Sequence, residues 1–318
     1  MGRQRSSRPP AENSGQRGDG PAAGSYDIDT GTAELIPDGD NPDGWLLKLN
    51  GVQSSHVDLS DPLRLDFEYM RWIVALVESQ WATASFPAPA RHRVLHLGGA
   101  ACSMARYLVA AYPDSHNLVV EIDSRLADLV RIWFNLPRAP QLKIRAGEAR
   151  AVTESLPDSS RDLIIRDVFA GPVTPKPLTT AEFTAQVHRV LAPAGVYVIN
   201  CGAPPSLVVA RQEAATLAAE FAHTVIIADP PMLKGRRYGN IILAGSDAPL
   251  GENPLLPRTL LGGAMPAQLW NDRQVRQFGR PAAVLTDNPR PLPRDHPSSP
   301  PIHAADPSTP APPPAETP

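Results

Sequence analysis

Residues 93–101 read RVLHLGGAA, and this stretch decides the fold. The apolar run at 93–97 has the length of a buried strand, and two glycines end it. Apolar residues then recur with helical spacing over 101–112. A strand that ends in glycines and leads directly into a helix is typical of the first unit of a Rossmann-like sheet. In such a sheet, ligands lie outside the carboxyl ends of the strands.

The same alternation of strand and helix continues along the chain. Strand-like segments occur at 117–123, 141–145, 162–167 and 195–200, and helix-like segments at 124–134, 180–191 and 205–221. The last two strands, 224–228 and 240–244, are joined by a short loop without a helical pattern, so we expect them to pair antiparallel. This order predicts an α/β fold with a mainly parallel, doubly wound sheet. It matches the seven-stranded sheet of methyltransferases.

The segments outside this sheet have a different composition. Turn signals at Asp38-Gly39-Asp40 and Asn50-Gly51 predict a small N-terminal β-hairpin module within 32–57. Proline accounts for 37 residues, and 13 of these lie in 281–318, where too little apolar surface is available to offset ordering entropy. The expected organisation is therefore a disordered tail at 1–25, the β module at 26–60, a folded domain at 61–293 and a proline-rich disordered tail at 294–318.

Composition excludes several classes of function. The 30 Lys and Arg nearly balance the 33 Asp and Glu, which argues against a dedicated nucleic-acid binder. No apolar run reaches the roughly 18 residues of a membrane span, and the N-terminus has no apolar segment of a secretory signal. Two cysteines cannot make a disulfide framework, so we expect a cytoplasmic protein whose partners are small molecules rather than nucleic acid or membrane.

Two groups of residues predict a nucleoside site at the carboxyl ends of the first two strands. Gly98, Gly99 and Ala101 are small enough to let a ligand approach the backbone at a helix N-terminus. Glu121 and Asp123 follow Gly98 by 23 and 25 residues, near the spacing of carboxylates that bind ribose hydroxyls. The alternative is that this acidic pair caps the next helix.

Two further carboxylates follow later strands. Glu148 could accept a hydrogen bond from an adenine amino group, or it could cap a helix. Asp167 ends the fourth strand beside the nucleoside site and is placed to act as a general base, the alternative being a structural aspartate. We expect His96, inside the first strand, to be a packed core residue, and Cys102 to be a small packing residue rather than a reactive thiol.

Taken together, these segments resemble the spermidine synthase (polyamine aminopropyltransferase) family over about residues 32–290. The motifs that carry the resemblance are VLHLGG at 94–99, VVEID at 119–123, GEA at 147–149, DLIIRD at 162–167, PLTTAEF at 177–183 and the helix and turn at 187–195. The small β module ahead of the sheet favours this family over ordinary methyltransferases.

The resemblance implies a reaction and roles for three carboxylates. An amine attacks the propyl carbon beside the sulfonium of decarboxylated S-adenosylmethionine, and methylthioadenosine leaves. No metal or prosthetic group is implied, and the S-adenosyl nucleoside is a co-substrate. By the match of motifs, Asp167 is the proton acceptor, Glu121 binds the ribose and Glu148 lies beside the adenine. The family also implies a homo-oligomer such as a homodimer.

Several positions depart from the family pattern. Ala101 replaces the aspartate that holds the donor's aminopropyl ammonium, and Ala170 replaces the second aspartate of the D-S-S-D-P loop. Residues 67–69, Phe-Glu-Tyr, stand at the Tyr-His/Gln-Glu patch, and Leu233 replaces a tyrosine. Because an unpaired buried ammonium is costly, we expect the usual diamine to bind poorly. Positive charge is added nearby by Lys234, Arg236 and Arg237, unless they form a solvated loop.

Three functions therefore stay open from the sequence. The leading one is an aminopropyltransferase of polyamine biosynthesis that uses Asp167 as base on an unidentified amine. The second is a methyltransferase that uses intact S-adenosylmethionine on the same scaffold. The third is a non-catalytic nucleoside-binding protein. Their products differ: methylthioadenosine for the first, S-adenosylhomocysteine for the second and neither for the third.

Overall fold

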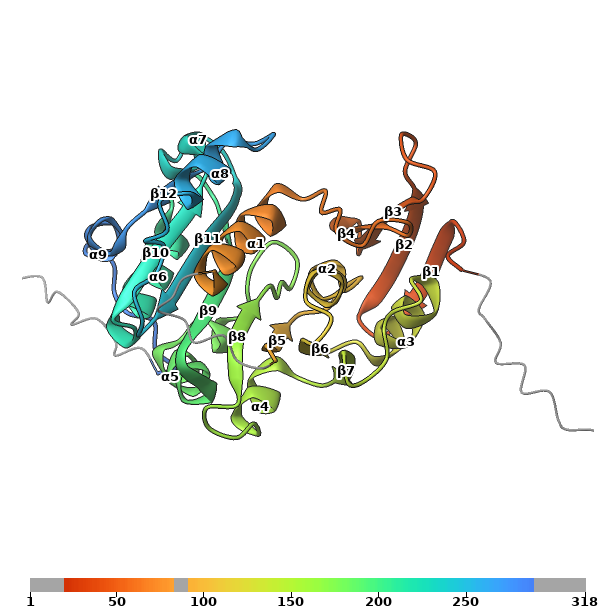
Figure 1. Ribbon diagram of the computed structural model, residues 1–318, viewed down its shortest axis with the longest axis horizontal. Coiled ribbons are helices and arrows are strands. Elements are labelled where there is room, and N and C mark those ends of the chain that lie inside the picture. Colours follow the sequence, from red (N-terminus) through yellow and green to blue (C-terminus); the bar gives the residue numbers. More distant parts are fainter. Residues whose placement is uncertain (1–19, 83–90, 289–318) are drawn as a thin grey trace, which may run out of the picture. The chain divides into compact units, whose positions relative to one another are not determined.

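Two sheets organise the chain in the computed structural model, which describes residues 20–82 and 91–288. A four-stranded sheet near the N-terminus is followed by an eight-stranded sheet with helices on both faces (Figure 1). Most of the N-terminal tail expected at 1–25 and all of the tail expected at 294–318 lie outside the described residues. Among the described residues, no helix combines the length and apolar character needed to cross a bilayer.

The N-terminal sheet is antiparallel throughout. Its strands, in the order β1-β2-β3-β4, are β1 (Gly24–Ile28), β2 (Gly31–Pro37), β3 (Gly44–Leu49) and β4 (Val52–Asp58). Both predicted turn signals lie between neighbouring strands. Asn50 and Gly51 have φ values of 50° and 80°, the left-handed backbone that a tight two-residue hairpin needs. The module expected from the sequence is therefore three hairpins in series rather than one.

The main sheet is parallel at its centre and antiparallel at one edge. Its strands are β5 (Arg93–Leu97), β6 (His116–Glu121), β7 (Leu142–Ala146), β8 (Arg161–Arg166), β9 (Leu191–Ala203), β10 (His223–Ala228), β11 (Gly239–Ser246) and β12 (Gln268–Trp270). The order is β12-β10-β11-β9-β8-β5-β6-β7. The predicted antiparallel pairing of β10 with β11 is confirmed. The predicted count of seven strands is wrong by one, because the short β12 pairs with the free edge of β10.

Nine α-helices and one short 3-10 helix connect the described strands. They are α1 (Glu68–Trp81), α2 (Ser103–Ala111), α3 (Ser124–Trp133), α4 (Ala149–Glu154), η1 (Lys176–Leu178), α5 (Ala181–Val190), α6 (Val208–Glu220), α7 (Pro230–Leu233), α8 (Leu256–Gly262) and α9 (Asp272–Gly279). The loop between β10 and β11 was expected to have no helix, but it contains α7. This single turn forms because the Asp229 carboxylate caps it by accepting from the Met232 amide.

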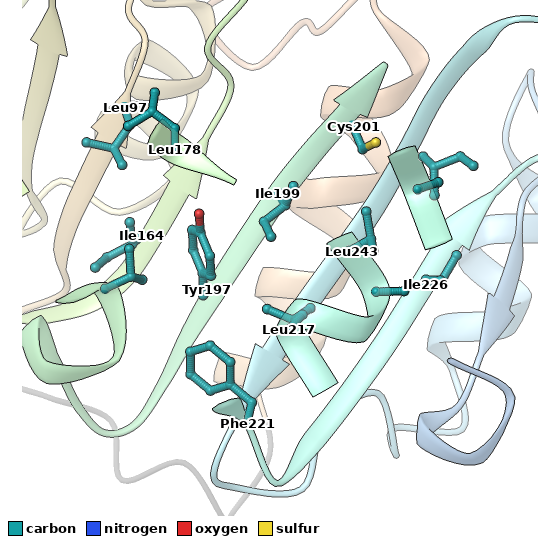
Figure 2. Close-up of a cluster of buried hydrophobic side chains, with 14 of the residues drawn as sticks. Leu97, Ile164, Leu178, Tyr197, Ile199, Cys201, Leu217, Phe221, Ile226 and Leu243 are labelled. Carbon is teal, nitrogen blue, oxygen red and sulfur yellow. The ribbon is translucent and has the colours of Figure 1, made fainter. Parts of the chain in front are cut away.

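Side chains that alternate along the strands build a core on each face of the main sheet. On one face, Ile164, Tyr197 and Ile199 pack with Leu217 and Phe221 from the region of α6 (Figure 2). On the other face, the intervening strand residues pack against α1, α2 and α8. Consecutive residues of a strand point to opposite faces of the sheet. Two neighbouring residues at a strand end therefore contact different helices.

The strand order reverses at β5. From β5 the chain passes to β6 and β7 on one side of the sheet, and later to β8 and β9 on the other side. Loops that leave neighbouring strands in opposite directions open a crevice outside the carboxyl ends of those strands. In this chain the two loops follow β5 and β8. A ligand site is therefore expected at residues 98–102 and at the segment that begins at Asp167.

Candidate active site

Close backbone contacts at the end of β5 make two glycines necessary. Gly98 has φ of 89°, and a Cβ there would lie 2.1 Å from the carbonyl oxygen of Asp167. A Cβ on Gly99 would lie 2.8 Å from Val119 Cγ1 on the neighbouring strand β6. The loop therefore passes directly between the ends of β6 and β8, which only residues without side chains allow.

Backbone amides of this loop hold the Glu121 carboxylate in place. Its Oε2 accepts from the amides of Gly99 and Ala100 at 3.0 and 3.1 Å, and its Oε1 accepts from the Asp123 amide at 3.1 Å. An ionised carboxylate has about four acceptor positions, two on each oxygen, so Oε1 keeps capacity for a further donor such as a hydroxyl group. Glu121 is half-buried at the end of β6, where a ligand can reach it.

Glu121 and Asp167 stand level with each other on the two sides of β5. Leu97, the last residue of β5, pairs with Val120 on β6 and with Arg166 on β8. Each carboxylate residue comes one position later, beside Gly98. Alternation along the strands places both side chains on the sheet face that α1 and α2 cover. Two carboxylates therefore flank the glycine loop from opposite sides.

The Asp167 carboxylate accepts one hydrogen bond at each oxygen. The Asn200 side-chain amide, from β9, donates to Oδ1 over 2.8 Å, and the Tyr69 hydroxyl, from α1, donates to Oδ2 over 2.9 Å. Burial raises the pKa of Asp167, and the bonds from Asn200 and Tyr69 oppose that rise. Because the bonds fix its orientation while burial makes it more basic, this carboxylate is suited to accept a proton.

Asn200 and Tyr69 were not among the residues singled out for the site from the sequence. Asn200 is 1% exposed, and its side-chain Oδ1 is a buried oxygen without a hydrogen-bond partner. A buried carbonyl oxygen that lacks a donor is costly, and a ligand N–H beside Asp167 would satisfy it. Tyr69 belongs to the segment 67–69, which the sequence marks only as an altered form of the family's Tyr-His/Gln-Glu patch.

Asp123 and Glu148 both cap helices. Asp123 accepts from the Leu126 amide at the start of α3, and its other oxygen accepts from the amide and hydroxyl of Thr30 in the N-terminal sheet. The exposed Glu148 accepts from the amides of Arg150 and Ala151 at the start of α4. The sequence allowed either helix capping or ligand binding for these two residues, and the structure contains the capping contacts.

The expected core roles of His96 and Cys102 agree with their surroundings. His96 is 3% exposed and forms a 3.0 Å bond with Asn117, and burial lowers its pKa to about 4. Cys102 is 4% exposed, and burial raises the pKa of its thiol to about 12, which leaves it protonated and unreactive at neutral pH. Both described cysteines are free.

The N-terminal sheet supports the loop after β5. The amide of Ala101, which is fully buried, donates to the Ser55 hydroxyl on β4 over 3.2 Å. Nearby, the Ser103 hydroxyl donates to the His56 carbonyl over 2.8 Å. The backbone of Ala101 thus contacts β4, and its side chain carries no charge.

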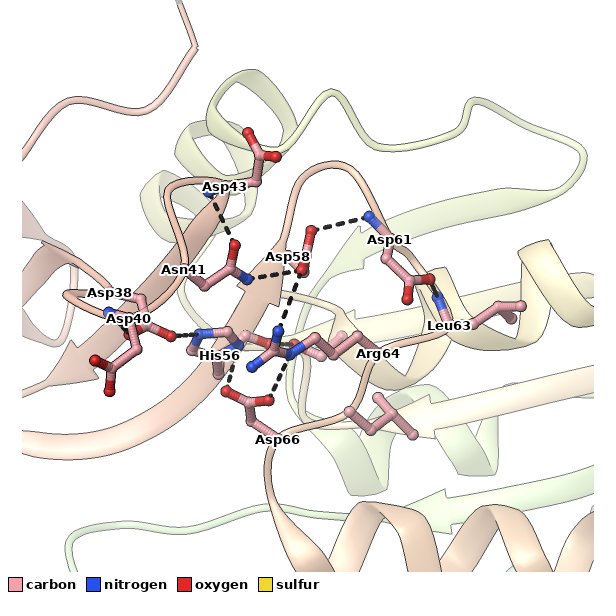
Figure 3. Close-up of polar contacts among 12 residues, drawn as sticks. Asp38, Asp40, Asn41, Asp43, His56, Asp58, Asp61, Leu63, Arg64 and Asp66 are labelled. Atoms are coloured by element: carbon pink, nitrogen blue, oxygen red, sulfur yellow. Dashed lines mark hydrogen bonds and ion pairs between the residues drawn. The ribbon is translucent and has the colours of Figure 1, made fainter.

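A polar cluster joins this sheet to the segment that leads into α1 (Figure 3). The two ring nitrogens of His56 each face one carboxylate oxygen at 3.0 Å, Nε2 facing Asp38 and Nδ1 facing Asp66. Arg64 pairs with the second oxygen of Asp66 at 2.9 Å. Because α1 begins two residues after Asp66, these contacts help to fix the start of the helix that carries Tyr69.

The positively charged loop predicted near the site is only partly solvated. The Arg237 guanidinium pairs with the buried Asp229 carboxylate, whereas Lys234 and Arg236 are exposed. Leu233, which replaces a tyrosine of the family pattern, is 7% exposed and packs in the core beside α6. Leu233 therefore contributes apolar packing to the core and gives the site no polar group.

Comparison with known proteins relates the chain to one family in particular. A structure described as a probable spermidine synthase from Corynebacterium glutamicum is 47% identical and covers 86% of this chain and 99% of its own, with a TM-score of 0.80. The polyamine aminopropyltransferase of Vibrio vulnificus is 29% identical over 47% of this chain and 48% of its own length. The chain spans about half the length of the curated relatives that it matches first.

The fold itself is shared more widely. Human methyltransferase-like protein 13, solved in complex with S-adenosylhomocysteine, is 19% identical and covers 72% of this chain and 97% of its own, with a TM-score of 0.50. At this identity the likeness concerns the fold alone. No protein-family model matches the chain.

Proposed function

The chain belongs to the spermidine synthase family, and on that premise we propose that it transfers an aminopropyl group from decarboxylated S-adenosylmethionine to an amine. One observation carries the proposal. Glu121 and Asp167 flank Gly98 at the same level, on the same face of the sheet. A nucleoside whose ribose binds at Glu121 would extend its sulfonium toward Asp167 across the loop in which Gly98 and Gly99 carry no side chains.

The chemistry needs a positioned amine and a place for its proton. The amine lone pair forms the new N–C bond, and the C–S bond breaks with its electrons passing to sulfur. The donor leaves as the neutral thioether methylthioadenosine. The positively charged product nitrogen gives its proton to the Asp167 carboxylate, and from there the proton passes to solvent. Because the sulfonium is already a good leaving group, orientation and proton removal are the protein's main tasks.

Neighbouring side chains serve these tasks in the proposal. Tyr69 and Asn200 each donate to one oxygen of Asp167 and so hold the carboxylate toward the amine. The unpartnered Oδ1 of Asn200 accepts an N–H of the same amine, which orients the nitrogen lone pair toward the donor. Glu121 binds a ribose hydroxyl through its Oε1, which among the described residues accepts only from the Asp123 amide. Glu148 and Asp123 contribute by holding the helices beside it.

A methyltransferase is the second candidate, and Ala101 is the observation that favours it. This residue is fully buried and has no charge to pair with the aminopropyl ammonium of a decarboxylated donor. Intact S-adenosylmethionine could then occupy the same crevice. A homodimer, as the family implies, is part of the proposal for the assembled protein.

The test combines calorimetric binding with product analysis. The full chain is titrated with decarboxylated S-adenosylmethionine, S-adenosylmethionine and methylthioadenosine, and is then incubated with each donor and a panel of primary amines. We expect tighter binding of the decarboxylated donor and amine-dependent release of methylthioadenosine. S-adenosylhomocysteine as product would replace the proposal by the methyltransferase, and no binding of any nucleoside would refute both.

The matched variant is Asp167→Asn, which keeps the shape of the side chain and removes its basicity. We expect donor affinity to be unchanged and turnover to fall by about 10²–10⁴-fold, the usual contribution of a general base. Turnover at the wild-type rate in this variant would remove Asp167 from the reaction.

A further inference from the structure

Beyond Asp167, the site is bounded by aromatic rings. Asn200 and Gly202 lie two positions apart on β9 and so face the same side of the sheet. A Cβ built on Gly202 would lie 2.9 Å from the Tyr238 hydroxyl oxygen and 3.0 Å from Phe169 Cε1. The Tyr238 hydroxyl and the edge of the Phe169 ring therefore fill the space that a side chain at position 202 would take. Going outward from Asn200, the next surface is aromatic.

The two rings come from separate loops that close over β9. Phe169 follows Asp167 by two residues and leads into a tight turn, in which the Ala170 amide donates to the Val173 carbonyl over 2.8 Å. Tyr238 immediately precedes β11, whose Asn240 pairs with Gly202. Both rings keep substantial exposure, 37% for Phe169 and 52% for Tyr238, so apolar surface remains available to a ligand.

Charge in these segments opposes a second ammonium group. Residues 168–180 and 200–207 contain no carboxylate, and residues 229–238 contain only Asp229. Asp229 is 5% exposed and is already used, because it pairs with Arg237 and caps α7. Lys234 and Arg236 of the same loop are exposed cations. Phe169 and Tyr238 together form an aromatic wall of the site. An ammonium group brought to this wall would lose its hydration, gain no anionic partner and lie near the positive charges of this loop.

From this wall, and resting on the proposed aminopropyl transfer, we propose that the acceptor is a primary monoamine with an apolar tail. The amine nitrogen lies beside Asp167 and Asn200, and the tail packs on Phe169 and Tyr238. The bonds made and broken are those of the proposed transfer, and the product is a secondary amine with one aminopropyl arm. Apolar burial against the two rings supplies the binding energy that ion pairs supply for a diamine.

The first experiment compares two acceptors of equal size. n-Pentylamine and putrescine, the four-carbon diamine, have the same number of heavy atoms and differ in whether the far end is a methyl or an ammonium group. The full chain is assayed with decarboxylated S-adenosylmethionine, and methylthioadenosine is measured with each amine. We expect kcat/KM to be at least about tenfold higher for n-pentylamine. Equal values, or a preference for putrescine, would overturn the monoamine proposal.

A pair of variants at the wall tests the assignment of the tail. Phe169→Asp adds a carboxylate and Phe169→Asn adds a neutral side chain of the same shape, at a position exposed enough for both to fold. We expect both variants to lose activity with n-pentylamine, and only Phe169→Asp to gain activity with putrescine, by about tenfold or more relative to Phe169→Asn. Unchanged n-pentylamine kinetics in both variants would overturn the placement of the tail.

Glu68 supplies a control, because it precedes Tyr69 and acts electrostatically on the Tyr69 phenol. If Glu68 were the partner of a second ammonium, Glu68→Gln would lower kcat/KM for putrescine and spare n-pentylamine, and that result would count against the proposal. We expect no such selective loss. Failure of the two proposals is distinguishable: donor binding with no use of n-pentylamine overturns the monoamine alone, whereas absence of donor binding overturns the transfer itself.

Discussion

Tyr69 and Asp167 lie 98 residues apart in the chain and share a 2.9 Å hydrogen bond in which the phenol donates to the carboxylate. The bond joins the start of α1 to the end of β8, so one residue of the connecting helix takes part in the geometry of the site. Burial raises the pKa of the Tyr69 phenol well above its usual range, and the Asp167 charge adds to the rise. Tyr69 therefore acts as a hydrogen-bond donor throughout the physiological range.

Removing that donor should move the pH dependence of the reaction. The Tyr69 bond lowers the pKa of Asp167, so Tyr69→Phe raises this pKa further, and a base must be ionised to accept a proton. We expect the acidic limb of the kcat/KM profile to shift to higher pH, with a smaller loss of rate on the alkaline side. The control is Tyr107→Phe, which removes a comparable 2.8 Å bond to Glu78 elsewhere. An unmoved acidic limb would contradict the role of Tyr69.

Replacing Glu121 should affect nucleoside affinity, whereas replacing Asp123 should affect stability. Glu121→Gln keeps an oxygen for the amides of Gly99 and Ala100 but removes the charge, and we expect nucleoside affinity to fall by about 1–3 kcal/mol. Asp123→Ala removes the cap of α3, so we expect about 1 kcal/mol of lost stability with affinity nearly unchanged. Calorimetric titration and urea unfolding of both variants measure the two effects. The reverse pattern would exchange the two roles.

A buried ion pair behind Asp167 should dominate local stability. Arg166 and Glu213 are 1% and 2% exposed and make a 2.6 Å contact. We expect Glu213→Gln to lower the free energy of unfolding by about 3–5 kcal/mol, because it leaves the Arg166 charge unpaired. The double replacement Arg166→Met with Glu213→Leu removes both charges and should cost less than the single change. Urea unfolding of the two proteins decides, and a costlier double replacement would contradict this account.

His188 should make stability depend on pH near neutrality. Burial lowers the pKa of His188, but the bonds to Asp247 at 2.6 Å and to Glu220 at 2.8 Å outweigh it and raise the pKa overall. A raised pKa in the folded state means that the stabilisation is complete below the unfolded pKa, about 6.5, and is lost as pH rises through the folded value. We expect Tm to fall over this interval in the wild type and to stay flatter in His188→Gln. Parallel curves would show that His188 contributes nothing.

Most strands could be predicted because each is a short apolar run that ends in a turn signal. The segment 93–97 matches β5 at both ends. The helix α1 was not predicted, although its sequence carries the signal: Glu68, Arg71 and Glu78 recur at helical spacing between the buried residues. The strand β12 has only three residues and forms by pairing with β10, a tertiary effect that its own sequence does not encode.

The sequence predicted only those site residues whose position is set by the end of a single strand. Asp167 and Glu121 follow from the pattern of strand and turn. Asn200 reaches the site through the side of β9 that it faces, which is not a local signal. Tyr69 reaches it through packing of α1 on the sheet, and the sequence marks its segment only through the resemblance at 67–69. Asp123 and Glu148 were ambiguous for a different reason: a carboxylate placed to cap a helix and one placed to bind a nucleoside occupy the same position after a strand.

The level arrangement of Glu121 and Asp167 also fixes the distance between the two carboxylate residues. Each lies beside β5 on a neighbouring strand, so their backbones are two strand spacings apart, about 10 Å. In an S-adenosyl nucleoside, the methyl carbon and the propyl carbon are both bonded directly to sulfur and so lie equally far from the ribose. The sheet can thus set where the sulfur stands but not which carbon faces the base. That choice is a rotation about a single bond, governed by side chains that hold the donor's tail, so one invariant spacing serves either transfer.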